Sequence, residues 1–359
     1  MPATRDDLVG ALLEHCGVLS VTGEEAALAD ALEARYRAGG RPVTRVGDSL
    51  VVGAPSGDRK VVALVGHLDV VPPTDADREP RVETRDGVEV VVGRGTSDMK
   101  AGNVVAMALL DDRELAASSP YDLVLVLYAR EEGPADENEL ADVLAAVPWL
   151  AEVDLAVVLE PTDGEVQAGC LGGIHAELVF TGRQAHSARP WHGENALTKA
   201  GAFLADLHAR GPDDVEVDGI AYRDVFTATQ AWTDNARNVV PGTFTVNLNY
   251  RFAPRFDVAA AERVLRDLVG DRAEVTVVDV APPAPPRLDT PLVAALVDAL
   301  GVPVTGKQAW TDLARFAELG VPAVNYGPGL TAQAHQRGEH VPVDALVDVH
   351  DRLRAFLTG

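Results

Sequence analysis

The sequence predicts a mixed α/β/α fold with a largely parallel sheet, and a smaller ferredoxin-like domain inserted into it. Short apolar runs alternate with helical patterns towards both ends of the chain, which is typical of a parallel sheet covered by helices. The middle of the chain instead reads β-α-β-β-α-β, the split βαβ unit. The length of 359 residues also exceeds the size at which a single core usually stops growing. We therefore expect two domains.

The first half of the chain carries the clearest strand and helix signals. Apolar runs that end in polar residues predict strands at Lys60–Val65, Asp122–Tyr128 and Asp154–Leu159. Helical patterns predict helices at Arg5–His15, Glu24–Ala38, Met99–Leu110 and Leu140–Ala146. Because functional residues of open α/β sheets gather at strand ends, we expect the active site there.

The middle section defines the inserted domain. Its predicted strands are 174–181, about 224–232, 239–252 and 273–280, and its predicted helices are 194–210 and 257–269. The Pro-rich stretch 281–286 (APPAPP) cannot join a sheet ladder and is expected to act as a semi-rigid connector. The α/β pattern then resumes with a helix at 291–300, a strand at 321–326 and a helix at 343–357. The predicted domains are 1–172 with 287–359, and 173–286.

Composition argues against nucleic acid and membrane as partners. With 31 basic and 55 acidic residues, the formal net charge of −24 repels phosphate backbones and anionic lipids. The N-terminal segment carries Asp6 and Asp7 where a secretory signal would need basic residues, and no apolar stretch reaches membrane-spanning length. The distant Cys16 and Cys170 suggest a reducing compartment. We expect a cytoplasmic protein that acts on a small molecule.

Acidic and imidazole side chains recur at the predicted strand ends and in nearby loops. They are His67, Asp98, Glu132, Glu160 and His335. Taken singly, each has an ordinary structural explanation: Asp98 precedes a predicted helix that it could cap, for example. Together they would crowd carboxylates on one rim of the sheet, which is unfavourable unless a cation neutralises them. Mixed carboxylate and imidazole ligands suit zinc, cobalt or manganese, so the set predicts a metal site.

Two further carboxylates have positions that suit supporting roles. His67 and Asp69 are two residues apart in an extended segment and project to the same side, so Asp69 can orient the imidazole through its second nitrogen. Glu131 and Glu132 are adjacent and point in different directions, so they can perform different tasks.

These motifs, in this order, resemble the di-zinc aminopeptidase and deacylase family over nearly the whole chain. The matching segments are GHLDVVP at 66, GRGTSDMKAG at 93, REEG at 130, LEPT at 159 and the late His335. The resemblance implies two divalent metal ions, zinc with cobalt as an alternative. It implies that His67 and Glu160 hold one ion, that Glu132 and His335 hold the other, and that Asp98 bridges them.

The resemblance also implies the catalytic roles. Asp69 would orient His67, and Glu131 would act as general base towards a hydroxide between the metals. The segment GRQAHSARP at 182 resembles the family segment that supplies a histidine to the oxyanion, here His186. His192 is an alternative for this role. In dimeric relatives this histidine reaches the opposite subunit, which implies a homodimer formed through the inserted domain.

Within the family, the pattern most resembles the desuccinylases that act on N-succinyl-L,L-2,6-diaminopimelate in lysine biosynthesis. The supporting segments are EPTDG at 160, GCLGG at 169, NVVPG at 238, NYRF at 249 and WTDLARF at 310. The resemblance implies a substrate pocket lined by Asn238, Arg251, Arg315 and Gly327. Arginine suits a substrate with several carboxylates because its planar fork binds a carboxylate with two hydrogen bonds. Both arginines could equally form structural salt bridges.

Two departures leave other activities open. Trp310 stands where many desuccinylases have a small residue, and Arg130 directly precedes the expected base where a small or acidic residue is common. The alternatives are another N-acyl amino acid deacylase, such as an acetylornithine deacetylase, or a dipeptidase. A non-catalytic binding protein is a remote alternative, because every position of the expected site is filled.

Overall fold

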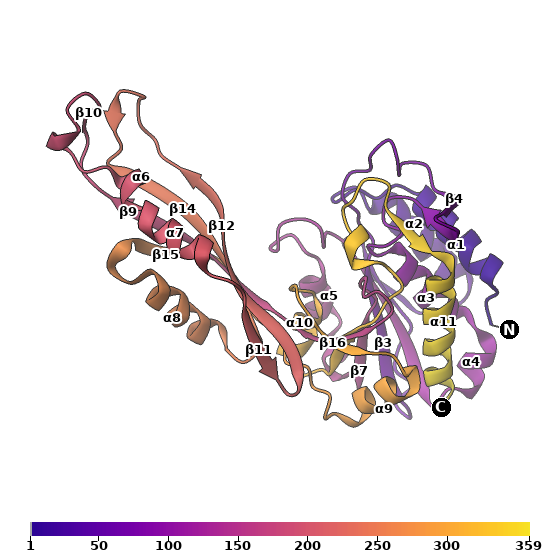
Figure 1. Cartoon of the computed structure of the whole chain (residues 1–359). Helices are drawn as coiled ribbons and strands as arrows, with labels where there is room; N and C mark the ends of the chain where they lie inside the picture. Colours follow the sequence, from indigo (N-terminus) through magenta and orange to yellow (C-terminus); the bar gives the residue numbers. More distant parts are fainter. Residues whose placement is uncertain (1) are drawn as a thin grey trace. The chain divides into compact units, whose positions relative to one another are not determined.

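The computed structural model describes residues 2–359 and confirms the predicted mixed α/β fold with its largely parallel sheet (Figure 1). The chain forms two compact units. The large unit comprises the residues up to Ala168, Arg287–Thr305 and Arg315–Gly359. The small unit comprises Gly169–Pro286 and Gly306–Ala314. The segment Gly306–Ala314 thus groups with the small unit, although the sequence pattern placed it in the discontinuous domain. The division into a domain of residues 1–172 with 287–359 and an inserted domain of residues 173–286 stays a prediction.

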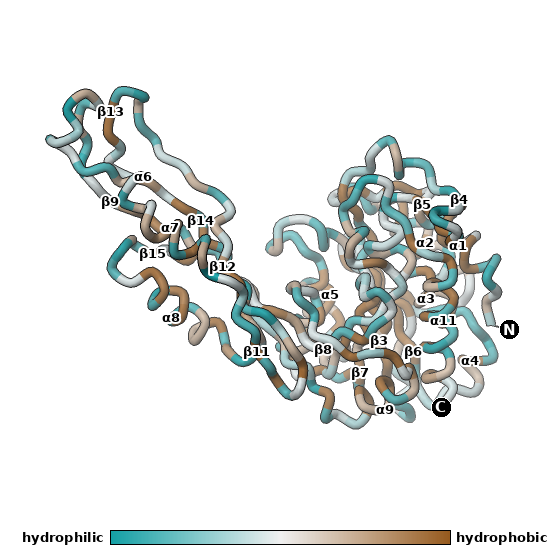
Figure 2. Tube along the Cα trace, viewed as in Figure 1, coloured by the Kyte–Doolittle hydropathy of each residue, from teal (hydrophilic) through white to brown (hydrophobic). Residues whose placement is uncertain are grey.

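An eight-stranded sheet forms the centre of the large unit. Its strands, in order across the sheet, are β1 (Val43–Val46), β2 (Ser49–Val52), β6 (Tyr121–Tyr128), β3 (Lys60–His67), β7 (Leu155–Val158), β17 (Ala323–Asn325), β8 (Val166–Cys170) and β16 (Val304–Lys307). The four central strands β6, β3, β7 and β17 run parallel, whereas β2 is antiparallel to β6 and β8 is antiparallel to β17. Strands buried on both faces need continuous apolar runs, and Figure 2 shows such residues along β3, β6 and β7.

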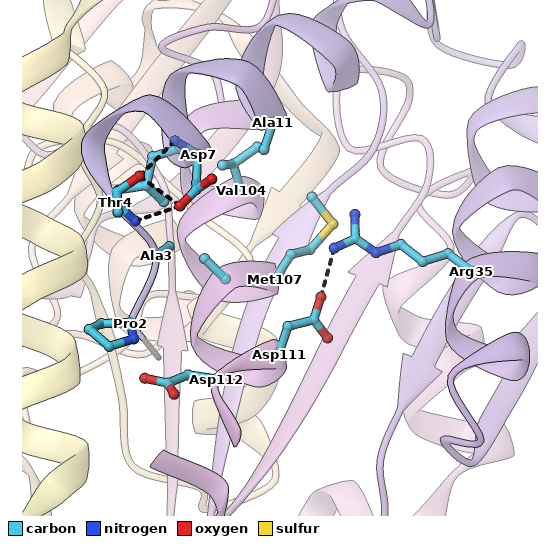
Figure 3. A pocket seen from close by; sticks show the side chains of 12 residues that line it. Pro2, Ala3, Thr4, Asp7, Ala11, Arg35, Val104, Met107, Asp111 and Asp112 are labelled. Atoms are coloured by element: carbon cyan, nitrogen blue, oxygen red, sulfur yellow. Dashed lines mark hydrogen bonds and ion pairs between the residues drawn. The ribbon is translucent and has the colours of Figure 1, made fainter. Parts of the chain in front are cut away.

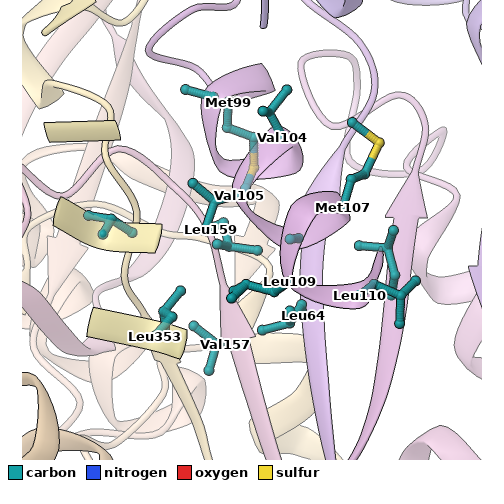
Figure 4. Close-up of a cluster of buried hydrophobic side chains, with 14 of the residues drawn as sticks. Leu64, Met99, Val104, Val105, Met107, Leu109, Leu110, Val157, Leu159 and Leu353 are labelled. Carbon is teal, nitrogen blue, oxygen red and sulfur yellow. The ribbon is translucent and has the colours of Figure 1, made fainter. Parts of the chain in front are cut away.

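The large unit also contains helices. They are α1 (Arg5–Gly17), α2 (Ala26–Ala38), α3 (Lys100–Asp111), α4 (Arg113–Ser118), α5 (Leu140–Ala146), α9 (Pro291–Leu300), α10 (Leu313–Glu318) and α11 (Val343–Thr358). Of these, α2, α3 and α5 contact strands of this sheet. Figure 4 shows α3 contributing Val104, Val105 and Leu109 to a core that also contains Leu64 of β3 and Leu353 of α11. Helices α1 and α11 contact α3, which centres the apolar core on that helix.

Close packing between α3 and the sheet places the loops at the strand ends. A Cβ added at Gly102 of α3 would lie 2.4 Å from the carbonyl oxygen of Leu159, just after β7. A Cβ at Gly66 of β3 would lie 2.0 Å from the Asn103 side chain, whose amide donates to the carbonyl of His67 at 2.6 Å. The absence of side chains at both glycines therefore brings the start of α3 directly onto the ends of β3 and β7.

A three-stranded antiparallel sheet supports another edge of the large unit. Its strands, in order, are β18 (His340–Pro342), β5 (Val88–Val92) and β4 (Arg81–Arg85). This sheet joins the segment before α11 to the segment before α3.

The small unit contains a five-stranded antiparallel sheet with helices. The strands, in order, are β11 (Asp213–Val217), β12 (Ile220–Trp232), β14 (Thr243–Phe252), β9 (Gly172–Thr181) and β15 (Glu274–Ala281). The helices are α6 (Ala196–Lys199), α7 (Gly201–Ala209) and α8 (Val258–Val269), and β10 (Ala185–His186) pairs separately with β13 (Val239–Val240). Apart from the added β11, the strand order is that of the expected ferredoxin-like unit.

Two elements differ from the sequence-based expectation in the small unit. The helix expected at 194–210 is divided into α6 and α7 at Ala200, immediately before Gly201, a residue that weakens helices. The strand expected at 239–252 is interrupted at Pro241 and Gly242, because proline has no amide to donate to a sheet ladder. Among residues 2–359, no helix is both long enough and apolar enough to cross a membrane.

Candidate metal centre

Four of the five predicted ligands lie together at the strand-end rim of the large unit. One ligand atom each from His67, Asp98 and Glu132 lies within 4.8 Å of the others. His67 Nε2 is 3.1 Å from Asp98 Oδ1, while His335 Nε2 is 2.8 Å from Glu132 Oε2 and 3.7 Å from Asp98 Oδ2. The Asp98 carboxylate thus lies between the two imidazoles.

The electrostatics of this cluster favour positive charge. Burial lowers the pKa of His67, but hydrogen bonds with Asp69 and Asp98 outweigh it and hold that pKa well above its ordinary value. The hydrogen bond with Glu132 likewise raises the pKa of His335. Two carboxylates and two imidazoles that converge in this way fit the ligand chemistry of a divalent transition metal ion.

Each ligand comes from a chain segment whose local structure positions it. His67 ends β3, and its main chain is held by Asn103. Asp98 lies in a loop just before α3, with a cis peptide bond to Met99. Glu132 follows β6, and His335 lies in the loop before β18 with a φ of 61°.

Asp69 connects the first ligand to the loop after β6. It is fully buried, and its main-chain oxygen and Oδ1 lie 3.0 and 3.5 Å from His67 Nδ1. Its carboxylate also accepts hydrogen bonds from the amides of Glu131 and Glu132, each at 3.0 Å, and from the Thr22 hydroxyl at 3.0 Å. Burial tends to raise the pKa of Asp69, but the hydrogen bonds from His67 and from both amides lower it below its ordinary value. The orienting role of Asp69 stays a prediction.

A second buried carboxylate, Glu25, also binds the loop after β6. Its Oε1 accepts hydrogen bonds from the amides of Gly23 at 2.9 Å and Arg130 at 3.2 Å. Arg130 has a φ of 64°, a left-handed conformation that is costly for a residue with a side chain. Its side chain reaches Glu137 at 3.3 Å. Sequence reasoning missed Glu25 and Thr22, because neither belongs to a strand-end motif.

Glu160 and Gly327 lie beside each other at the end of β7. Glu160 is buried, and the group of three ligand atoms within 4.8 Å does not include it. A Cβ at Gly327 would lie 2.4 Å from the carbonyl oxygens of both Leu159 and Glu160. Gly327 also exchanges hydrogen bonds with the Thr162 hydroxyl through its amide and carbonyl. Glycine at this position lets the loop after β17 lie directly on the Glu160 main chain.

Three predicted site residues belong to the small unit. His186 and Asn238 are exposed and lie in the adjoining β10 and β13 segments, where the Ser187 amide donates to the Asn238 carbonyl at 2.8 Å. His186 Nδ1 accepts from the Ala188 amide at 3.1 Å. Arg251 lies on β14 opposite Gly173, and burial lowers its pKa. His192, the alternative to His186, is also exposed.

Arg315 and the unusual Trp310 lie in different units. Arg315 is on α10 of the large unit and donates to the Ala135 carbonyl at 3.3 Å. Trp310 is in the small unit, where its indole N–H donates to the carbonyl of Pro282 in the Pro-rich connector at 3.1 Å. Trp310 therefore has a structural partner of its own.

A separate cavity of about 340 Å³ lies among α1, α2 and α3 and contains none of the predicted site residues (Figure 3). Its polar side chains have structural partners: Asp111 pairs with Arg35 at 2.7 Å, and Asp7 accepts hydrogen bonds from Thr4 at the start of α1. The metal-ligand cluster is therefore the better candidate for chemistry.

Curated relatives cover nearly the whole chain. The chain is 38% identical over 356 residues to a Mycobacterium tuberculosis protein provisionally named succinyl-diaminopimelate desuccinylase DapE, and the match covers 98% of each chain. It is 35% identical to the succinyl-diaminopimelate desuccinylase of Corynebacterium glutamicum, covering 94% of this chain and 93% of the relative.

Solved structures share the fold at lower sequence identity. A tripeptidase from Staphylococcus aureus superposes with a TM-score of 0.77 at 17% identity, covering 100% of this chain and 99% of the other. The Bacillus subtilis YXEP protein, described as a dinuclear metal-binding peptidase, has a TM-score of 0.70 at 14% identity and coverages of 99% and 97%. The family model of Peptidase family M20/M25/M40 matches residues 63–358, a range that includes every predicted metal ligand. This match and the curated relatives show that the chain belongs to this family of hydrolases.

Proposed function

We propose that this protein is a metal-dependent amide hydrolase that removes succinate from N-succinyl-L,L-2,6-diaminopimelate. The observation that carries the proposal is the convergence of His67, Asp98, Glu132 and His335, with Glu131 directly beside a ligand. The names of the two curated relatives support the succinyl substrate. The buried Glu160 completes the proposed set of five ligands.

The proposed ligands would hold two divalent ions, zinc or cobalt. His67 and Glu160 would bind one ion, Glu132 and His335 the other, and Asp98 both. Such ions act as Lewis acids towards an amide carbonyl and can lower the pKa of water to about 7. The dinuclear description of the Bacillus subtilis structure supports two ions rather than one.

The chain's own residues would then perform the proton transfers and the positioning. Glu131 would accept a proton from the attacking water and deliver it to the departing amine. Asp69 would fix the main chain of Glu131 and Glu132 by accepting hydrogen bonds from their amides, and it would fix the orientation of the His67 ring. His186 would donate a hydrogen bond to the oxygen that becomes negatively charged.

Substrate carboxylates need fixed cations in a protein with a net charge of −24. Arg251 and Arg315 would supply them, with Asn238 and the amide of Gly327 as additional donors. Arg251 is half-buried and burial lowers its pKa; a partly desolvated guanidinium is a suitable group for binding a carboxylate. Trp310 would limit the size of the acyl pocket.

A homodimer formed through the small unit is part of the proposal. Strand β11 pairs with β12 only over Ile220–Asp224, so among residues 2–359 no other strand of the five-stranded sheet pairs with the outer edge of β12 from Val225 onwards. Unpaired strand edges are ready sites for association with a second chain. Analytical ultracentrifugation of the active protein tests this step: a monomer with full activity would contradict it.

The function is tested by turnover of a small substrate panel. Purified protein loaded with zinc or cobalt is incubated with N-succinyl-L,L-diaminopimelate, N-acetylornithine and a dipeptide, and amine release is measured. We expect preference for the succinyl substrate. Loss of a general base costs about 10²–10⁴-fold, so Glu131→Ala should reduce kcat by that factor while metal binding is retained.

The possible outcomes separate the parts of the proposal. Preference for N-acetylornithine or the dipeptide would leave the metal site intact and overturn the roles assigned to Arg251, Arg315 and Trp310. If metal-loaded protein turned over none of the substrates, the hydrolase assignment itself would fail. Full activity of Glu131→Ala would remove Glu131 as the base.

A further inference from the structure

We infer that Glu339 is a positioning residue that places the bridging ligand Asp98 relative to the segment carrying His335. The inference rests on the proposed metal site and concerns a residue outside its ligand set. Glu339 is 1% exposed, and it lies four residues after His335, immediately before β18. It has no part in the proton transfers described above.

The Glu339 carboxylate binds the loop before α3 through four donors. Oε1 accepts hydrogen bonds from the amides of Ser97 at 2.8 Å and Asp98 at 2.9 Å. Oε2 accepts from the amide of Gly95 at 3.0 Å and from the Arg94 guanidinium at 2.8 Å. The amide of the proposed bridging ligand is therefore held directly by a residue 241 positions away in sequence.

Other contacts tie the same two segments together. The Gly93 amide donates to the main-chain oxygen of Glu339 at 3.0 Å, and the Ser97 hydroxyl donates to the carbonyl of His340 at 2.8 Å. Arg94 also lies 3.4 Å from Asp77, whose carboxylate accepts from the Gly338 amide at 2.6 Å. Glu339 is the member of this network that contacts the main chain of Asp98 itself.

The four partners of Glu339 are all N–H donors, and none can become an acceptor. A glutamine side chain of the same shape would offer one oxygen to two of these donors and would direct its NH₂ at the other two. Buried polar groups left without a partner are costly, and here donors would also face donors. Glu339→Gln therefore changes the hydrogen bonding at the Asp98 amide with little change in volume, and without replacing any of the proposed metal ligands.

The test measures metal binding by protein from which metal has been removed. Zinc dissociation constants are determined by competition with a chelator, and the visible absorption of the cobalt-loaded protein reports ligand geometry. Loss of residues that support metal ligands typically costs 10- to 100-fold in metal affinity, so Glu339→Gln should weaken zinc binding by that factor and alter the cobalt spectrum. The KM should change little relative to kcat, because Glu339 would not touch the substrate.

Asp112→Asn is the matched control. Asp112 is a buried carboxylate that also accepts from two amides, those of Glu114 and Leu115, and from an arginine, Arg354, but it holds α4 and α11. We expect it to lower stability and leave zinc affinity and the cobalt spectrum unchanged. If Asp112→Asn weakened metal binding as much as Glu339→Gln, the effect would be general destabilisation and the inference would be wrong.

Glu339→Asp keeps the test decisive if the glutamine variant fails to fold. Aspartate retains the charge opposite Arg94 but is one methylene shorter, so we expect partial retention of metal affinity, between that of Glu339→Gln and the unmodified protein. Unchanged zinc affinity and cobalt spectrum in a folded Glu339 variant would overturn the inference. If the unmodified protein bound no metal, the proposed function would fail instead, so the two failures are distinguishable.

Discussion

The predicted site residues of the large unit and those of the small unit are supported in opposite ways. In the large unit, the buried carboxylates of Asp69, Glu25 and Glu339 accept hydrogen bonds from the amides of the loops that carry Glu132 and Asp98. These loops are fixed by charge-assisted bonds inside the protein, where such bonds are strong.

In the small unit, His186 and Asn238 are exposed, and their segments are joined by the two-residue pairing of β10 with β13. Few buried contacts restrain them, so this segment should open at low free-energy cost. We therefore expect the proposed metal ligands to be held in place in advance, and the proposed site residues of the small unit to adjust when substrate binds.

Metal removal should give the largest effect and should be confined to one unit. A chelator is expected to abolish turnover and to destabilise the large unit, by about 4 kcal/mol relative to protein with free metal at a thousandfold excess over Kd. Hydrogen exchange measured by mass spectrometry should show faster exchange near His67 and Glu132, with little change in β9 and β14. Added zinc should reverse both effects. An equal increase of the hydrogen-exchange rate in both units would contradict the expectation that metal stabilises only the large unit.

Substitution of His186 should reduce catalysis without affecting the metal site. Loss of one oxyanion donor costs about 10²–10³-fold in kcat, and His186→Ala should show a loss of that size with unchanged zinc affinity. His192→Ala is the matched control, because His192 is exposed on the same segment, and its kcat should stay near that of the unmodified protein. A loss of kcat in His192→Ala but not in His186→Ala would assign the oxyanion donor to His192. Weaker zinc binding by His186→Ala would contradict the expectation that only the large unit determines metal affinity.

Substitution of Asp69 tests whether the buried carboxylates of the large unit hold the proposed metal ligands in place. In Asp69→Asn, an NH₂ group must face at least one of the donors that the carboxylate now accepts from, including the amides of Glu131 and Glu132. A residue that orients a metal ligand typically contributes 10- to 100-fold in affinity, so we expect zinc binding to weaken by that factor. Competition with a chelator measures it. Unchanged affinity would mean that the Asn103 contact and the sheet suffice to orient His67.

Much of the large unit could be predicted because its strands are continuous apolar runs. The strands expected at Lys60–Val65 and Asp122–Tyr128 appear as β3 and β6, and the helix expected at Leu140–Ala146 has the same bounds as α5. Two of the predicted ligands, His67 and Glu132, lie at or just after the ends of these strands, so their gathering at one rim could be anticipated from the strand ends.

The supporting carboxylates could not be predicted in the same way. Glu25 and Glu339 bind main-chain amides, which every residue except proline possesses, so the sequence of the partner loop carries no sign of the contact. Short elements were missed for a related reason. A two-residue pairing such as that of β10 with β13 is too brief to produce a periodic pattern.

The smallest predicted effect tests whether the Asp69 network is redundant. The Thr22 hydroxyl donates to Asp69 at 3.0 Å, and Thr22→Val removes this donor while preserving shape. Loss of one such hydrogen bond should lower the free energy of unfolding by about 1–2 kcal/mol, measured by denaturant titration. Thr22→Ser keeps the hydroxyl and should retain most of this stability. In Thr22→Val the Asp69 carboxylate still accepts hydrogen bonds from the amides of Glu131 and Glu132, so zinc affinity should fall less than in Asp69→Asn. Equal losses of zinc affinity in Thr22→Val and Asp69→Asn would mean that the loop carrying Glu132 depends on every single hydrogen bond to Asp69. The large unit would then hold its site residues no more firmly than the small unit holds the His186 segment.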